Sequence, residues 1–270
     1  MFMNYCNNGN IDMIKKMSLK YCYVEAGFTK ACEKGHYGIV KYLAELHINY
    51  PEYAKINFNY DDMMAFRAAC INGHYEIVKY MCDFCINFPN SYNVIDFYDM
   101  EDPYAKEYDK DYHKYGGSVI YTAFVYGHLN IVKYLVELYK YNKNYKPITQ
   151  YVSLNSCLEA ASEYGHLDIV KYLVELYKND NTYEQFSDYM IGECITIALE
   201  YKKCDVAKYF INLYKNNKDY KIITSINSAL YWSLMWGYKD ILYLLTLHIK
   251  KNKYFINNIY YFRKIDKHLL

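Results

Sequence analysis

Four histidines follow a glycine directly in the sequence, at His36, His74, His128 and His166. Imidazole is the usual side chain for acid–base catalysis and for binding transition metals, but either role needs side chains that converge on one point. These histidines occur one at a time, in four similar segments separated by dozens of residues. This spacing spreads them along a line, so we expect them to form structural turns and to hold no metal or cofactor.

Two cysteines, Cys82 and Cys85, form a lone C-x-x-C motif within a total of nine cysteines. A zinc site needs further ligands, and a redox-active pair belongs in a strand–helix setting. The surrounding segment has helical spacing instead, which favours buried helical thiols over a metal site. An odd number of scattered cysteines is typical of an intracellular protein in a reducing compartment.

The acidic segment 88–118 has enough carboxylates for calcium but lacks the sharp-turn glycine of an EF-hand loop. We therefore expect a solvated surface insertion there. The sequence contains no phosphate-binding glycine loop, H-E-x-x-H or G-x-S-x-G motif. These observations predict no catalytic residues, no cofactor and no enzymatic activity.

The basic tail, residues 248–270, carries six Lys or Arg residues against one Asp, interleaved with tyrosines. Two interpretations are open. The tail binds RNA or a membrane surface, or residues 255–270 form a C-terminal capping helix with an apolar face and a solvated basic face, which is simpler. The net charge of the chain, +1, does not favour nucleic acid as a partner, and no apolar run is long enough to span a membrane.

The elements that position these residues come from an internal repeat. The stretches GHLNIVKYLVELYK (127–140) and GHLDIVKYLVELYK (165–178) differ at one residue, and weaker copies occur elsewhere. The seven copies begin at Gly9, Gly35, Gly73, Gly127, Gly165, Lys202 and Gly237, which we call the anchors. Four of the six intervals between anchors fall between 35 and 38 residues, which is typical of a repeat protein.

Each repeat has the spacing of two helices joined by a turn. An apolar residue lies seven positions before the anchor, and a small residue, mostly Ala, lies four before it. Apolar pairs follow four and five positions after the anchor, and another apolar residue follows at eight. Apolar residues three to four apart form one face of a helix, and glycine suits the turn because it adopts left-handed backbone angles without strain.

Segments such as ACEKGHYGIVKYL (31–43) and ASEYGHLDIVKYL (161–173) resemble the A-A-x-x-G-H-x-x-I-V-x-x-L core of the ankyrin repeat. With its many Tyr, Asn, Lys and Ile residues, the chain also resembles the ankyrin-repeat proteins of amoeba-infecting giant viruses. The resemblance implies an all-α fold in which residues 1–270 form a single ankyrin-repeat solenoid of stacked helix–turn–helix units. The T-P-L-H start of the first helix and the Gly-Ala after the second are missing, which implies irregular long loops in place of regular hairpin fingers.

The resemblance further implies a soluble, intracellular, non-enzymatic scaffold, a monomer that binds an unidentified protein partner. For a viral protein, that partner is a host protein in the host cytoplasm. In the family, the two positions before the turn glycine face a concave groove and contact the partner. The residues expected to bind a partner are Tyr126, Glu163, Tyr164, Glu200, Tyr201, Met235 and Trp236. The residues expected to form the turns are Gly35, His36, Gly73, His74, Gly127, His128, Gly165, His166 and Gly237.

Two alternatives remain open on the sequence alone. Because the chain has 38 tyrosines, the aromatic column before the turns can reflect composition rather than function. The alternative function is nucleic-acid or membrane-surface binding through the basic aromatic tail.

Overall fold

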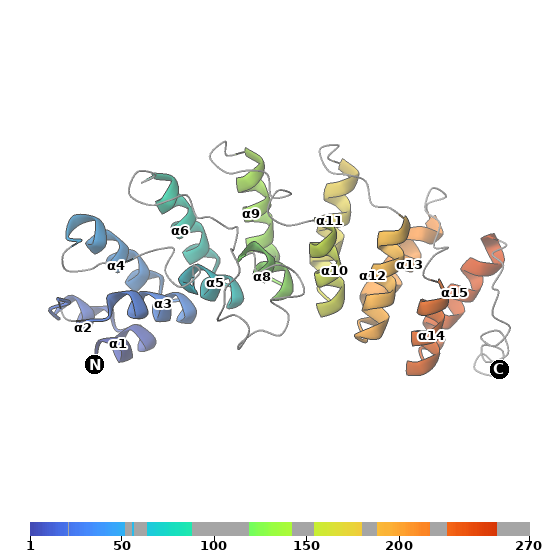
Figure 1. Cartoon of the computed structure of the whole chain (residues 1–270), viewed down its shortest axis with the longest axis horizontal. Coiled ribbons are helices and arrows are strands. Elements are labelled where there is room, and N and C mark those ends of the chain that lie inside the picture. Colours follow the sequence, from blue (N-terminus) through green and yellow to red (C-terminus); the bar gives the residue numbers. More distant parts are fainter. Residues whose placement is uncertain are drawn as a thin grey trace. The chain divides into compact units, whose positions relative to one another are not determined.

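The structure is a computed structural model that describes residues 1–20, 22–51, 56, 64–87, 119–141, 154–179, 188–216 and 226–252. These residues contain fourteen helices and no strand (Figure 1). The chain divides into two compact parts, Met1–Ser153 and Leu154–Leu270, and each is described by itself.

The N-terminal part holds repeats one to four, each made of two helices. They are α1 (Phe2–Asn8) with α2 (Ile11–Lys15), α3 (Val24–Lys34) with α4 (Tyr37–Asn49), α5 (Met64–Ile71) with α6 (Tyr75–Asn87), and α8 (Val119–Val125) with α9 (Leu129–Tyr141). The first helices α1, α3, α5 and α8 pack side by side in chain order, and the second helices α4, α6 and α9 do the same (Figure 1).

The C-terminal part holds repeats five to seven in the same arrangement. They are α10 (Leu154–Tyr164) with α11 (Leu167–Asn179), α12 (Asp188–Glu200) with α13 (Cys204–Asn216), and α14 (Ile226–Trp236) with α15 (Lys239–Asn252). Here α12 packs between α10 and α14, and α13 packs between α11 and α15. Each described repeat therefore contributes one helix to a layer of first helices and one helix to a layer of second helices, as the repeat spacing predicted.

The predicted apolar positions form the core between these layers. Their described side chains are buried, with exceptions in repeat one. Seven residues before the anchor, the buried side chains are Phe2, Phe28, Phe66, Leu158, Ile195 and Leu230. Four before it, they are Ala31, Ala69, Ala123, Ala161, Ala198 and Ser233. The exceptions are Met13 and Met17, both expected in the core of repeat one: Met13 is 37% exposed and Met17 is half-buried. Met13 lies on α2, whose five residues are too short to bury both members of the apolar pair.

Each repeat turns at its anchor residue in a left-handed backbone conformation. The anchor glycines have φ between 70° and 84°, and Lys202 takes the same conformation with φ 62°. At the end of α3 the N–H of His36 donates to the carbonyl of Ala31 at 2.9 Å, and the N–H of Gly35 donates to the carbonyl of Cys32 at 3.4 Å. This pair of bonds is the usual way in which a left-handed residue ends a helix and satisfies two of its last carbonyls.

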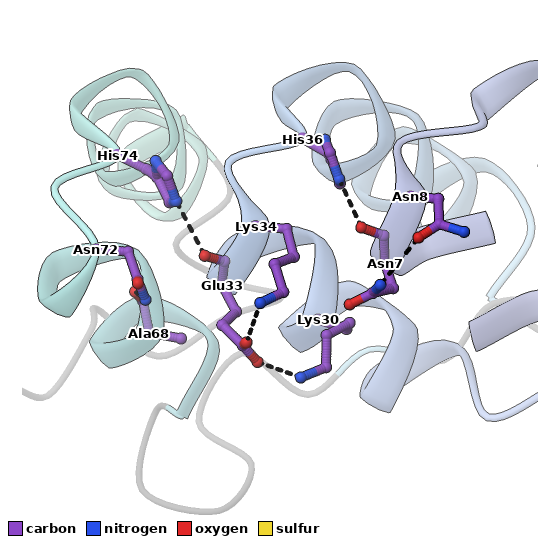
Figure 2. A network of polar contacts seen from close by, with 9 residues as sticks. All are labelled: Asn7, Asn8, Lys30, Glu33, Lys34, His36, Ala68, Asn72 and His74. Carbon is purple, nitrogen blue, oxygen red and sulfur yellow. Dashed lines mark hydrogen bonds and ion pairs between the residues drawn. The ribbon is translucent and has the colours of Figure 1, made fainter. Parts of the chain in front are cut away.

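The turn histidines reach across to the preceding repeat. Nε2 of His36 lies 2.9 Å from the carbonyl of Asn7, Nε2 of His74 lies 2.9 Å from the carbonyl of Glu33, and Nε2 of His128 lies 2.8 Å from the carbonyl of Ile71. Figure 2 shows the first two of these bonds. A carbonyl oxygen only accepts, so Nε2 carries the proton and donates it. Each accepting carbonyl lies two residues before an anchor, where a helix end leaves carbonyls without partners inside the helix.

The same histidine ring covers the glycine of the preceding repeat. A Cβ atom added to Gly35 would lie 2.6 Å from Cε1 of His74, and one added to Gly73 would lie 2.6 Å from Cε1 of His128. In repeat six a lysine replaces the histidine, and a Cβ on Gly165 would lie 2.7 Å from Cδ of Lys203. At Gly35 and Gly73 glycine is therefore required twice, once for its backbone angle and once for the close approach of the next repeat, whereas at Gly165 the flexible Lys203 side chain can move aside.

Tyrosines on the second helices make further contacts between repeats. The rings of Tyr37 and Tyr80 meet edge to face at 5.7 Å between centroids, and those of Tyr75 and Tyr134 meet in the same way at 5.8 Å. Tyr80 and Tyr134 both stand seven residues after an anchor. The tyrosine of the repeated K-Y pair is thus a packing residue between neighbours.

The single difference between the two near-identical stretches does not change their local contacts. Oδ1 of Asn130 accepts a hydrogen bond from the N–H of Ile131 at 2.9 Å, and Oδ1 of Asp168 accepts one from the N–H of Ile169 at the same distance. The exchange of amide for carboxylate therefore keeps the start of the second helix as it is.

Several sequence expectations lie outside the described residues. These are the acidic insertion 88–118, the capping helix 255–270, and most of the segments that follow the second helices, on which the expectation of irregular loops in place of hairpin fingers depends. They stay predictions.

The double requirement for glycine predicts different costs at two anchors. Gly35 and Gly237 have similar backbone angles, φ 76° and 70°, so alanine at either costs about 1–2 kcal/mol of backbone strain. Among the described residues no atom lies within 4 Å of a Cβ on Gly237, whereas at Gly35 the ring of His74 must move and its hydrogen bond is lost, which costs about 1 kcal/mol more. We expect urea denaturation to show a larger loss for Gly35→Ala than for Gly237→Ala; equal losses would contradict the second requirement.

The hydrogen bond from His74 predicts a loss of stability when its donor is removed. His74→Ala leaves the Glu33 carbonyl without this donor, and we expect the free energy of unfolding to fall by about 1–2 kcal/mol. The matched control is Asn72→Ala, because the Asn72 side chain bonds within its own helix, to the carbonyl of Ala68 at 2.8 Å; it should cost less than about 0.5 kcal/mol. Losses of the same size in both variants would show that the histidine does not join the repeats.

Candidate functional site

The candidate binding surface is the pair of positions directly before each turn. In the C-terminal part, Tyr201 is 45% exposed, Met235 54% and Trp236 40%, and Glu200 is also exposed. Tyr164 is half-buried. In the N-terminal part, Tyr126 follows α8 and is 43% exposed. Most residues predicted to bind a partner therefore present their side chains to solvent.

One of the predicted residues does not. Glu163 is 4% exposed, so its side chain is buried and the expectation that it contacts a partner was wrong. The position two before the anchor lies on the side of the first helix that meets a neighbouring repeat, and Glu33, Ile71 and Val125 are half-buried at the same position. In repeats two to five this position is buried or half-buried, whereas in repeats one, six and seven, at Asn7, Glu200 and Met235, it is open to solvent.

The exposed aromatics of repeat seven are held in place by their neighbours. Trp236 stacks on Trp232, one turn earlier on α14, with 6.2 Å between ring centroids and 11° between planes. Trp232 in turn meets Tyr231 edge to face at 5.2 Å. Nζ of Lys202, from the turn of repeat six, lies 3.8 Å from the ring centroid of Trp236, which is a favourable cation–π geometry. Tyr231, Trp232 and Trp236 form what we call the α14 aromatic cluster.

The half-buried Tyr164 is held differently. Its ring lies parallel to that of His166, across the turn of its own repeat, with 6.3 Å between centroids and 6° between planes. Tyr164, predicted to bind a partner, and His166, predicted to form the turn, therefore contact each other. Tyr164 has less surface available to a partner than Tyr201 or Trp236 has.

At the equivalent positions of repeats two and three, Glu33, Lys34 and Asn72 are polar, and Ile71 is half-buried. Glu33 forms ion pairs with Lys30 and with Lys34, the latter at 3.0 Å (Figure 2). Hydrogen bonds from Lys30 and then Lys34 lower the pKa of the Glu33 carboxyl. Asn72 bonds back to its own helix. These polar side chains bond within their own repeats, so the exposed apolar residues of the column are Tyr126 in repeat four and Tyr201, Met235 and Trp236 in repeats six and seven.

The cysteines are arranged for packing rather than chemistry. Cys6, Cys32, Cys70, Cys157 and Cys194 are buried in first helices. Burial raises the pKa of the Cys6 thiol to about 12 and raises the pKa of the other four as well. A thiol with a raised pKa is a poor nucleophile and a poor metal ligand.

Metal binding has no support in the part of the chain that the structure describes. Cys82 of the C-x-x-C motif is buried on α6, while the side chain of Cys85 lies outside the described residues. Among the described residues, no three or more His, Cys, Asp or Glu side chains gather as a metal site would require. His36, His74 and His128 donate their Nε2 protons to carbonyls, which leaves that nitrogen without a lone pair for a metal.

A family model described as ankyrin repeats, in three copies, matches residues 2–93 and 102–185, more than half of the chain. The chain belongs to the ankyrin-repeat family. Its fold is accordingly an all-α stack of ankyrin repeats, and such repeats are generally protein–protein interaction modules and typically non-enzymatic scaffolds. A search of curated proteins gives no match. Within the described residues, no helix has the length and apolar character needed to cross a membrane.

The sequence of this ankyrin-repeat protein identified the exposed positions before the turns but not the side chains that hold Trp236 in place. Tyr231, Trp232 and Lys202 were not among the predicted binding residues. A signal for them was present, because the chain has only two tryptophans and both stand on one helix, four residues apart. Residues four apart share a helix face, so this pair marks one side of α14.

The burial of the thiols predicts the order in which they react. Cys22 and Cys204 are partly exposed, whereas Cys32, Cys70, Cys157 and Cys194 are buried. We expect iodoacetamide at pH 8 to modify Cys22 and Cys204 first, and the four buried thiols only after unfolding, as read from peptide masses. Fast modification of the buried thiols in the folded protein would contradict the packing role.

Proposed function

We propose that this chain is a non-enzymatic protein-binding module whose partner contacts the exposed residues before the turns of repeats six and seven. The contact residues are Glu200, Tyr201, Met235 and Trp236. The observation that carries the proposal is the α14 aromatic cluster, a solvent-facing group of large side chains already held in one arrangement.

The energetics of protein interfaces favour this location. Trp and Tyr are the residues most often responsible for binding energy at interfaces. Side chains that are fixed before binding lose little conformational entropy when a partner arrives. Trp236, stacked on Trp232 and covered on one face by Lys202, meets this condition while 40% of its surface is open.

Composition explains the tyrosines better than it explains the tryptophans. With 38 tyrosines in the chain, an exposed tyrosine is common, but tryptophan occurs only twice. Both tryptophans lie in the α14 aromatic cluster, which supports a selected role for this surface. Tyr126 and Tyr164 are secondary in the proposal, because Tyr126 belongs to the other compact part and Tyr164 is half-buried.

The finer identity of the partner rests on the composition of the chain and on family resemblance. We propose that the protein is viral, acts as a monomer in the cytoplasm of an amoebal host, and binds a host protein there. The basic tail, as a site for nucleic acid or a membrane surface, remains the alternative; residues 253–270 lie outside the described part, and no described contact favours it.

The test begins with an affinity pull-down from an amoebal lysate, with mass spectrometry to identify the partner. The triple variant Tyr201→Ala, Met235→Ala, Trp236→Ala should then bind this partner at least about 30-fold more weakly, the effect of losing one interface residue worth about 2 kcal/mol. Circular dichroism and the melting temperature should show that the helices remain folded.

The matched control is the double variant Lys34→Ala, Asn72→Ala, which changes the polar residues directly before the turns of repeats two and three. This double variant should bind as the unchanged protein does. Normal binding by the triple variant would show that the aromatic surface is not the site, and an equal loss in the control would place the contact along the whole column.

A further inference from the structure

The second helix of repeat one is much shorter than the second helices that follow it. α2 has five residues, whereas α4, α6 and α9 have thirteen each. A difference of eight residues corresponds to about 12 Å of helix, at about 1.5 Å per residue. After α2 the chain continues as a non-helical segment over residues 16–20, so the second half of α4 has this segment, and not a helix, beside it.

The side of α4 that faces repeat one corresponds to the side of α6 that packs on α4. Tyr42 and Leu46 stand seven and eleven residues after their anchor, as Tyr80 and Phe84 do in repeat three. The ring of Tyr80 meets that of Tyr37 on α4 at 5.7 Å, and Phe84 is only 5% exposed. Leu46 is half-buried at the position of Phe84. Repeat two is therefore more open on this side than repeat three.

A cavity of about 280 Å³ lies at this open side. Its lining side chains come from the segment after α2 and from one stripe along α4: Met17, Ser18, Leu19, Tyr42, Leu46 and Tyr50. The last three are spaced four residues apart, and residues at this spacing share a helix face. The cavity thus has apolar and aromatic walls with a few hydroxyl groups.

The charge on the repeat-one wall of the cavity is positive. The three lysines of this wall, Lys15, Lys16 and Lys20, are exposed on either side of the lining residues. Nζ of Lys15 lies 5.7 Å from the ring centroid of Tyr42, which itself lines the cavity. Between residues 13 and 24 the sequence has no Asp or Glu.

The acidic residue of α4 is directed toward repeat three instead. Glu45 pairs with Lys41 of its own helix at 3.9 Å. Burial, and then the Glu45 carboxylate, raise the pKa of the Tyr80 hydroxyl on α6 to about 12, which shows that this carboxylate lies on the far side of α4 from repeat one. The cavity is therefore beside the lysines and away from this acid.

Volume and charge together indicate the kind of ligand. Pockets for small molecules usually span about 300–1,000 Å³, so about 280 Å³ suits a small molecule better than a helix of a partner protein, which is about 10–12 Å across. Apolar walls favour an apolar group. A lysine ammonium beside them favours a carboxylate or a similar anion, because a hydrogen bond between charged groups is stronger than one between neutral groups.

We propose that the cavity between α4 and the segment after α2 binds a small amphipathic carboxylate, with its apolar part against Met17 and Leu46 and its charge near Lys15. The apolar part is an aliphatic chain or an aromatic ring, and the experiment distinguishes the two. This site shares no residue with the partner surface of repeats six and seven, and it stands whether or not that surface binds a protein.

Isothermal titration calorimetry on the full chain tests the proposal with decanoate and 2-naphthoate, which share the carboxylate and differ in the apolar part. At least one should bind with one site per chain, and the tighter of the two identifies the apolar part. The amine with the same apolar part, decylamine or 2-naphthylmethylamine, should bind at least about 10-fold more weakly. Equal affinity for carboxylate and amine would overturn the proposal, and so would binding of neither carboxylate.

Two variants and their matched controls locate the site. Leu46→Trp fills the cavity and Lys15→Glu reverses the charge beside Tyr42, and each should weaken carboxylate binding at least about 10-fold. The controls are Ile48→Trp, on α4 but outside the lining, and Lys41→Glu, the lysine at the same position of repeat two. Both controls should bind as the unchanged protein does.

Circular dichroism should show that all four variants keep their helices. Unchanged binding by a folded Leu46→Trp variant would overturn the proposal, because the carboxylate would then bind elsewhere. Equal losses in Lys15→Glu and Lys41→Glu would also overturn it, because only the net charge of the chain would then matter.

Discussion

In the N-terminal part, the packing of each repeat on the one before it depends on a hydrogen bond from a turn histidine to the helix-end carbonyl of the preceding repeat. A helix ends with carbonyls that have no partner within it, and the left-handed turn satisfies two of them. The histidine of the next repeat reaches a third, at Asn7, Glu33 and Ile71. The histidine ring lies against the anchor glycine of the preceding repeat, close to where a Cβ would be. The backbone of one repeat and the side chain of the next are therefore in direct contact there.

This joint also decides which side chains are available to a partner. In repeats two and three the residue two before the anchor, Glu33 or Ile71, gives its carbonyl to the joint and has a half-buried side chain. The residue one before the anchor is exposed in every repeat except repeat five, where Tyr164 is half-buried. In repeat six, Lys202 and Lys203 replace Gly and His, and Lys202 lies over Trp236 of repeat seven instead. The exposed aromatic surface thus occurs where the usual joint is replaced by a cation–π contact.

The sequence predicted the frame of the fold because the frame depends on local spacing. The alanines four before each anchor and the apolar residues seven before it are buried as expected, since both follow from helix periodicity. The histidine joint was missed because its partners are 29, 41 and 57 residues apart and no periodicity connects them. Glu163 was assigned to the surface for the same reason: whether that position is open depends on how closely the next repeat packs, which differs between repeats five and six.

The joint has an evolutionary consequence. In repeats two and three the glycine contacts the histidine of the following repeat, and the histidine contacts the glycine of the preceding repeat, so one Gly-His dipeptide carries both halves of the contact. A duplicated gene segment that spans such a repeat therefore encodes both the glycine and the histidine that its neighbours need for this contact. Duplication of such a repeat would produce near-identical stretches like those at 127–140 and 165–178, and an array built in this way would lengthen without redesign of its interior.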